Sequence, residues 1–272
     1  MPELPEVETI KNVLKPHLIG RTISAVTVNN GAVFARPCAE EFVARLQGQT
    51  FTDFTRKGKF LTLHFESGDS VVLHLRMTGC LTIEPNDTPC EKHTHIVFTL
   101  DDGNALRYED TRRFGKFWYI ENETPDTFSG KDKLGIEPFD ITLDYIKAKF
   151  GKSKKPLKEL LLDQSIITGI GNIYSDEICF AANILPDKAG KGLTDAELQR
   201  LCETIPERLT YFIDKNKIPF EEYALTKGKT YRNTPYLQMY GNKGKPCPLC
   251  GKTLIGKTIG GRSAVYCPHC QK

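Results

Sequence analysis

Hydrophobic and polar positions change their spacing along the chain. From residue 5 to 18, apolar residues recur every three or four positions and predict a helix that begins at Pro5: Val7, Ile10, Leu14 and Leu18. Beyond it, apolar and polar residues alternate in short runs separated by turns rich in Gly and Asp, which is typical of β-strands. Strands are expected at 22–34, 50–56, 59–66, 70–76, 80–84, 94–100, 105–109 and 116–120. Many short strands of this kind predict a β-sandwich or a flattened barrel.

From residue 141 the spacing becomes helical, with helices expected at 141–150, 156–163, 172–183, 194–215 and 219–224. The longest begins with Thr194-Asp195-Ala196-Glu197, a capping-box sequence. Residues 226–240 combine Gly, Thr, Asn and Pro with little periodicity, so we expect a mobile loop there. The pattern thus predicts a β-rich N-terminal domain, residues 1–133, followed by a helical domain, residues 134–240.

Charge is unevenly distributed, although the net charge of the 272 residues is only +3. No acidic residue follows Glu222, whereas lysines and arginines continue to the end of the chain. A second basic run, Lys152–Lys155 with Lys158, lies mid-chain. A lysine run alone usually marks a solvated surface, but a C-terminal segment free of acid favours a polyanionic partner. No apolar run suits a signal peptide or a membrane span, so we expect a cytoplasmic protein without a membrane partner.

Four of the nine cysteines form two Cys-x-x-Cys pairs, Cys247/Cys250 and Cys267/Cys270. Each pair places two thiolates on one side of a tight turn, and together they make a tetrahedral sulfur site. Four thiolates favour a single structural zinc ion, because no open coordination position remains for catalysis. This predicts a zinc ribbon over residues 241–272, with Arg262 at the tip of its hairpin. The other cysteines are expected to be reduced and idle: Cys38, Cys80, Cys90, Cys179 and Cys202.

The second residue offers unusual chemistry. Removal of Met1 before the small Pro2 would leave a free secondary amine. The pKa of an α-amino group is about 7.7–8.0, against about 10.4 for lysine, so much more of it is neutral at physiological pH. A neutral amine can attack a sugar C1′ and hold it as an iminium. Together with the basic metal ribbon, this indicates covalent chemistry on DNA.

Several motifs together resemble the bacterial formamidopyrimidine-DNA glycosylase family, over residues 2–271: Pro2–Glu6, Arg112–Gly115, Gly169–Tyr174 and the four-cysteine ribbon. The resemblance implies an α+β multidomain fold. An N-terminal β-sandwich with an N-terminal helix would precede a helical domain with a helix–two-turn–helix element, roughly residues 156–183, and the zinc ribbon. It also implies a bifunctional glycosylase/AP lyase that excises 8-oxoguanine and formamidopyrimidines from double-stranded DNA. One domain pair around one duplex suggests a monomer.

The resemblance assigns catalytic roles. Pro2 matches the nucleophile, and Glu3 matches a carboxyl that protonates the sugar and shuttles protons during β,δ-elimination. Glu6 matches a second carboxylate, with a simple helix N-terminal charge as its alternative. Lys59 falls where the family places a lysine that contacts phosphate and helps at the lesion, and Lys57 is its rival.

DNA-binding roles follow in the same way. Asn172 is expected at a helix N-cap, and Arg262 is also expected to act in catalysis. The two residues would bind the DNA backbone on either side of the damaged nucleotide. Lys154 represents the mid-chain basic run. Met77, Arg112 and Phe114 match residues that fill the hole left by a flipped base. Burial in the core is the alternative for Met77 and Phe114.

Two positions depart from the family pattern. Thr78 stands where some members carry a glutamate near the flipped base, and residues 218–238 fit the lesion-capping loop poorly. The preferred lesion therefore stays open. One alternative is an endonuclease VIII-like glycosylase for oxidised pyrimidines, although that branch begins Pro-Glu-Gly-Pro and this chain has Leu4. Another is a homologue that binds damaged DNA without excision.

Overall fold

The computed structural model describes residues 2–272, which divide into two compact units. The first unit comprises Pro2, Glu6–Asp132 and Asn216–Arg232, and the second comprises Glu3–Pro5, Lys133–Lys215 and Asn233–Lys272. The units are therefore not continuous in sequence, because residues 216–232 follow most of the second unit along the chain but pack in the first. Domain boundaries at 133/134 and 240/241 stay a prediction. Across residues 2–272, no helix combines the length and apolar character needed to cross a membrane.

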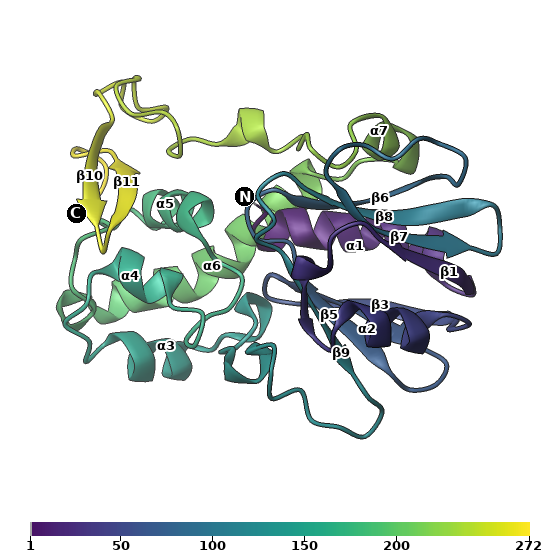
Figure 1. Cartoon of the computed structure of the whole chain (residues 1–272). Coiled ribbons are helices and arrows are strands. Elements are labelled where there is room, and N and C mark those ends of the chain that lie inside the picture. The colour runs from purple at the N-terminus through teal and green to yellow at the C-terminus, as the bar shows by residue number, and fades with distance from the viewer. Residues whose placement is uncertain (1) are drawn as a thin grey trace. The chain divides into compact units, whose positions relative to one another are not determined.

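The first unit is a β-sandwich, whose two sheets form separate layers in Figure 1. One sheet has the order β1-β7-β8-β6 and is antiparallel: β1 (Ile23–Val28), β7 (Thr94–Leu100), β8 (Asn104–Asp110) and β6 (Gly79–Pro85). The other has the order β2-β9-β5-β4-β3: β2 (Phe34–Arg36), β9 (Lys116–Ile120), β5 (Ser70–His74), β4 (Phe60–Phe65) and β3 (Phe51–Lys57). Only the β2–β9 pair of this sheet is parallel.

Alternating side chains from both sheets fill one core, which also contains residues of α1 (Leu4–Leu18), such as Ile10 and Leu14. Hydrophobic burial at this scale stabilises by about 1.5–3 kcal/mol per large side chain. Helix α7 (Phe220–Leu225) joins the same core through Tyr223, whose hydroxyl donates to the Leu81 carbonyl at 2.7 Å. The first unit thus includes a segment from near the C-terminal end of the sequence.

Two expectations for this unit were wrong. The strand expected at 22–34 ends at Val28, because a 3-10 turn follows in which the Asn30 side chain accepts from the N–H of Ala32. Helix α2 (Ala39–Leu46) was not expected. Its buried side chains, Phe42 and Leu46, stand four positions apart as in a helix, but a segment of eight residues is too short for that spacing to identify a helix.

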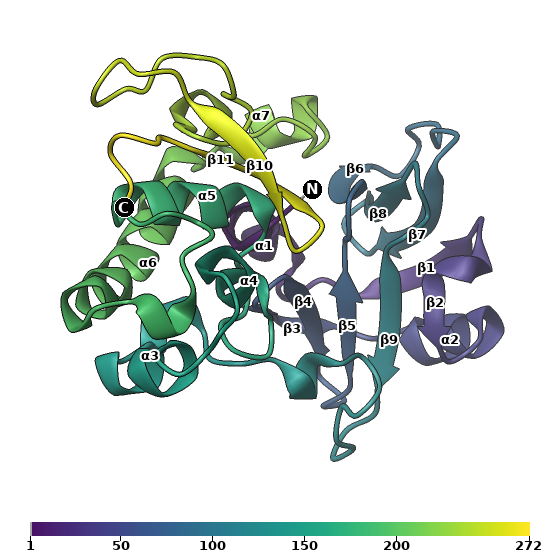
Figure 2. The same ribbon diagram turned by 90° about the vertical axis from the view of Figure 1, so that its left-hand side faces the viewer.

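The second unit packs α3 (Leu143–Phe150), α4 (Leu157–Leu162), α5 (Asn172–Ala181) and α6 (Asp195–Lys215) around an apolar core. The capping box is confirmed, since Thr194 and Glu197 bond to each other's backbone N–H groups at 3.3 and 2.9 Å. The hairpin of β10 (Ile255–Ile259) and β11 (Arg262–Tyr266) lies beside α5 (Figure 2). Phe180 of α5 joins the small core of this ribbon.

Candidate nucleic-acid site

Pro2 lines a pocket of about 240 Å³ in the first unit, called here the Pro2 pocket. Its walls come from the β6 end of the sandwich and from residues 216–232, called here the returning segment: Met77, Thr78, Gly79, Cys80, Thr111, Gly228, Lys229 and Tyr231. Burial raises the pKa of Cys80 to about 12, so this residue is a neutral thiol and not a competing nucleophile. Met1, whose removal the chemistry requires, lies outside the described residues.

Glu3 lies in the second unit, where its side chain is fully buried at the start of α5. The Glu3 carboxylate accepts from the backbone N–H groups of Gly171 at 2.8 Å and of Ile173 at 2.9 Å. Tyr174 N–H is a third donor, at 3.3 Å. A Cβ on Gly171 would lie 2.4 Å from the Glu3 carboxyl carbon, so this close approach requires glycine. The amides of a helix N-terminus thereby fix the position of this carboxyl.

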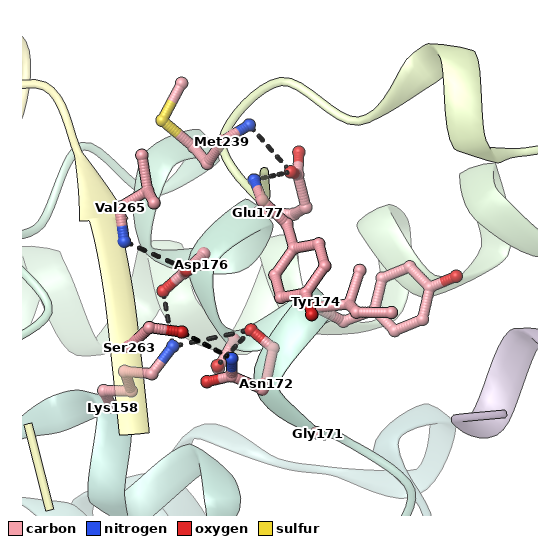
Figure 3. A network of polar contacts seen from close by, with 12 residues as sticks. Lys158, Gly171, Asn172, Tyr174, Asp176, Glu177, Met239, Ser263 and Val265 are labelled. Atoms are coloured by element: carbon pink, nitrogen blue, oxygen red, sulfur yellow. Dashed lines mark hydrogen bonds and ion pairs between the residues drawn. The ribbon is translucent and has the colours of Figure 1, made fainter. Parts of the chain in front are cut away.

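These contacts correct the expectation for Asn172. The N-cap of α5 is Gly171, with extended backbone, and Asn172 is the first helical residue. The reason is that a distant carboxylate caps the helix in place of the local side chain. Asn172 instead donates to the hydroxyl of Ser263 at 3.2 Å (Figure 3). This bond brings it beside the start of β11, where Arg262 is exposed.

Lys158 is not part of a basic surface, contrary to its place in the mid-chain run. Its side chain is fully buried and pairs with Asp176 at 2.6 Å (Figure 3). Asp176 also accepts from the N–H of Val265 at 3.1 Å, so the ion pair ties α4 and α5 to the ribbon. Burial raises the pKa of Asp176 to about 6. Lys154, in contrast, is exposed and available to solvent.

The neighbouring Glu177 anchors the chain that leads into the ribbon. Its buried carboxylate accepts from the N–H groups of Met239 at 2.8 Å and Tyr240 at 3.0 Å (Figure 3). Asp176 and Glu177 were not predicted to be buried, because charged residues on a helix usually lie on its solvated surface. Consecutive acids on an otherwise apolar helix are the only signal that could have found them.

Met77, Arg112 and Phe114, called here the wedge group, lie together in the first unit. Arg112 Nη1 is 3.0 Å from the sulfur of Met77, and the guanidinium lies 4.5 Å from the centre of the Phe114 ring. Met77 is 43% exposed and Phe114 is 48% exposed. These values exclude the core alternative for both side chains. Exposed apolar side chains grouped around an arginine indicate a contact surface.

Lys59 lies in the turn between β3 and β4, and Lys57 ends β3. His74, which was not predicted as a site residue, pairs in register with Phe60 next to Lys59. Burial, together with the charges of Arg76 and Lys59, lowers the pKa of His74 to about 3. Its Nδ1 accepts from the N–H of Arg76 at 3.0 Å, so the other ring nitrogen carries a hydrogen and can donate.

The four cysteines of the ribbon form one cluster, whose sulfur atoms all lie within 4.8 Å of one another. Cys247 and Cys270 are separated by 3.9 Å, and Cys250 and Cys267 by 3.5 Å. A tetrahedral zinc with Zn–S bonds of about 2.3 Å requires sulfur atoms about 3.8 Å apart. The donor set therefore fits the predicted structural metal ion, with zinc as the preferred identity.

Three family models match the chain. They describe the formamidopyrimidine-DNA glycosylase N-terminal domain at residues 1–117, the formamidopyrimidine-DNA glycosylase H2TH domain at 134–222, and a zinc finger found in FPG and IleRS at 244–272. The formamidopyrimidine-DNA glycosylase of Carboxydothermus hydrogenoformans is 39% identical and both chains are covered completely. That of Streptococcus pyogenes is 39% identical over 100% of this chain and 99% of its own.

Solved structures show the same fold. Lactococcus lactis Fpg bound to DNA containing an oxidised pyrimidine has a TM-score of 0.91 at 30% identity, with both chains completely covered. The same protein bound to DNA containing Fapy-dG also has a TM-score of 0.91 at 30% identity, over 99% of this chain and 100% of the other. These similarities confirm the expected β-sandwich, helical H2TH domain and four-cysteine ribbon.

Proposed function

The chain belongs to the formamidopyrimidine-DNA glycosylase family and is a DNA glycosylase, and on this premise we propose that it excises oxidised purines from duplex DNA. The substrates are 8-oxoguanine and formamidopyrimidines, and the enzyme then cleaves the abasic strand as an AP lyase. The observation that carries the proposal is the position of Pro2, which lines a pocket large enough to admit part of a nucleotide, beside Met77.

The reaction begins when the Pro2 nitrogen attacks C1′ of the flipped nucleotide. The glycosidic bond breaks, the base leaves with a proton, and the sugar opens to an iminium. The iminium acidifies the 2′ proton, whose loss expels the 3′ phosphate, and a second elimination expels the 5′ phosphate. Glu3 is the proton shuttle, because its carboxyl follows Pro2 directly and is held in a fixed position by backbone amides.

DNA binding combines phosphate contacts with a wedge. Asn172, Arg262, Lys154 and Lys59 bind phosphates, since they offer donors or positive charge without base-specific geometry. The wedge group fills the space left by the flipped base, and Arg112 bonds the orphaned partner base. The four cysteines hold one zinc ion, whose role is to keep the ribbon and Arg262 rigid. We propose a monomeric, cytoplasmic enzyme on double-stranded damaged DNA.

Borohydride trapping tests this mechanism directly. Incubation with an 8-oxoguanine duplex and borohydride should yield a covalent protein–DNA adduct, and intact mass should show that Met1 is absent. Pro2→Gly should abolish base excision, while Pro125→Gly, in an exposed loop, should behave as the unmodified chain. A chain that forms no adduct, or whose Pro2→Gly variant is trapped equally well, would overturn the proposal.

Oxidised pyrimidines are the second candidate substrate. Lactococcus lactis Fpg has been crystallised with DNA that contains an oxidised pyrimidine. This chain also has Thr78 at the position where some relatives have a glutamate near the flipped base. A panel of duplexes with 8-oxoguanine, a formamidopyrimidine and thymine glycol separates the two. Faster excision of thymine glycol would favour the pyrimidine branch. Tight lesion binding without any strand cleavage would indicate a binding protein.

A further inference from the structure

Two turns that carry the wedge group converge on one buried side chain. The first turn follows β5 and contains Met77 and Thr78, and the second follows β8 and contains Arg112 and Phe114. Asp110, at the end of β8, is fully buried between them. Its carboxylate accepts from the backbone N–H groups of Arg112 at 3.0 Å and Gly115 at 2.9 Å.

Thr78 completes the link from the first turn. Its hydroxyl donates to Asp110 Oδ1 and accepts from the N–H of Arg112 at 3.2 Å. One hydroxyl therefore joins the Met77 turn to both the acid and the backbone of the Arg112 turn. An ionised glutamate at this position could not make the same pair of bonds, because it has no proton to donate to Asp110.

Tyr108 connects Asp110 to the core of the sandwich. Its hydroxyl donates to Asp110 Oδ2 at 3.0 Å, and its ring packs against Phe117 in the sandwich core. A Cβ on Gly115 would lie 1.8 Å from the Tyr108 hydroxyl, so the second turn can approach only because residue 115 is glycine. The two turns are thereby fixed to a rigid sheet.

Both turns also contain a residue in a strained backbone conformation. Arg76, immediately before Met77, has φ 57°, and Arg113, between Arg112 and Phe114, has φ 57°. Such conformations persist only where surrounding contacts hold them in place. The bonds to Asp110 and Thr78 flank Arg113 on both sides. The N–H of Arg76 bonds to His74 Nδ1 at 3.0 Å, and the turn that follows it is tied to Asp110 through Thr78.

We propose that Asp110 and Thr78 are positioning residues that hold the wedge group in the geometry required to fill the opened duplex. The proposal rests on the proposed function of the chain as a glycosylase. Asp110 does not contact the reacting atoms, so its effect on the reaction is indirect. It acts on the step in which the base is flipped, before the amine attacks.

Thr78→Val tests the proposal, since it removes the hydroxyl and keeps the size of the side chain. We expect single-turnover excision of 8-oxoguanine to fall about tenfold, because small misplacements of positioning groups have effects of this order or more. Fluorescence of 2-aminopurine beside the lesion, which reports unstacking, should rise less on binding than with the unmodified chain. Thr78→Ser should restore both signals. Asp110→Asn should show the larger effect.

Thr82→Val is the matched control, because Thr82 lies on β6, which begins directly after Thr78, and its buried hydroxyl has no hydrogen-bond partner among the described residues. It should leave both measurements unchanged. Equal fluorescence and excision for Thr78→Val and the unmodified chain would overturn the proposal, as would a Thr78→Ser variant that is equally impaired. The fluorescence change requires only binding and opening. A chain that opens the duplex but never excises would thus refute the glycosylase mechanism without refuting this role.

Discussion

The carboxylate of Glu3 accepts a hydrogen bond from the backbone N–H of Gly171 at 2.8 Å, across 168 positions of sequence. Together with the bonds from Ile173 and Tyr174, it replaces the local side chain that usually caps a helix. The Glu3 carboxylate thus stabilises the start of α5. The same bonds fix the position of a residue that directly follows the proposed nucleophile in the sequence. Removing its charge tests the structural part of this relationship.

Glu3→Gln should destabilise the start of α5. The new amide NH2 would face backbone N–H donors, so at least one buried donor loses its acceptor, at a cost of about 1–3 kcal/mol. Hydrogen exchange of the Ile173 and Tyr174 amides should be faster by one to two orders of magnitude. Glu40→Gln, in the exposed first turn of α2, is the control and should leave those amides protected. Unchanged protection in Glu3→Gln would show that the carboxylate does not cap α5.

The zinc ribbon should depend on each of its four sulfurs. Cys270→Ala should abolish the binding of one zinc equivalent, since three thiolates no longer close the site, and chelation should do the same to the unmodified chain. Affinity for duplex DNA should then fall about tenfold or more, because Arg262 lies on the hairpin that the metal supports. Cys90→Ala, at an exposed cysteine outside the cluster, should retain the metal. Metal content is measured by atomic absorption, and a fully loaded Cys270→Ala protein would contradict the assignment.

Regular elements were predictable wherever apolar side chains alternate or recur without interruption. The strands expected at 94–100 and 116–120 agree with β7 and β9, because most of their residues face a packed interior. The zinc ribbon was equally predictable, because its four cysteine ligands are close in sequence. The wedge group emerged only through family resemblance, because Met77 and Phe114 alone have the composition of core residues.

Other features depend on contacts that sequence spacing does not encode. Lys158 follows three lysines in the same run, yet it is the buried member, and only tertiary packing against Asp176 determines this. The same holds for residues 216–232, whose return to the first unit depends on Tyr223 entering a core formed by residues more than a hundred positions earlier. His74 was missed because one histidine in a strand pattern usually marks only a solvated position.

His74 should make the stability of the first unit fall with acid. Its folded pKa of about 3 lies below the usual value of 6.5, so the unfolded chain binds the extra proton between these pH values. The free energy of unfolding therefore decreases as pH falls from 6.5 toward 3, by about 2 kcal/mol at pH 5. His74→Gln should remove this part of the pH dependence in urea titrations at pH 7 and pH 5. His17→Gln, at an exposed histidine, should retain it. An identical pH slope in His74→Gln would contradict the buried neutral imidazole.

Lys229 should hold the returning segment against the Pro2 pocket. Lys229 lines the pocket, and its ammonium group pairs at 2.9 Å with Glu109, a carboxylate that is only 4% exposed. This hydrogen bond raises the pKa of Lys229, so its ammonium group stays charged through neutral pH. Lys229→Met leaves the Glu109 charge buried without its partner, which should destabilise the first unit by about 1–3 kcal/mol and raise KM for lesion duplexes.

The double variant Lys229→Met/Glu109→Gln separates the two contributions. Because it removes the uncompensated charge, it should recover most of the lost stability in urea unfolding, while KM stays raised if the ammonium itself contacts DNA. Lys227→Met provides a comparison, because Lys227 lies on the same segment as Lys229 but is not among the residues that line the pocket. Lys227 pairs with Glu84 and Glu91. Lys227→Met should destabilise the first unit without raising KM for lesion duplexes. Additive losses in the double variant would show that Lys229 and Glu109 do not interact in solution.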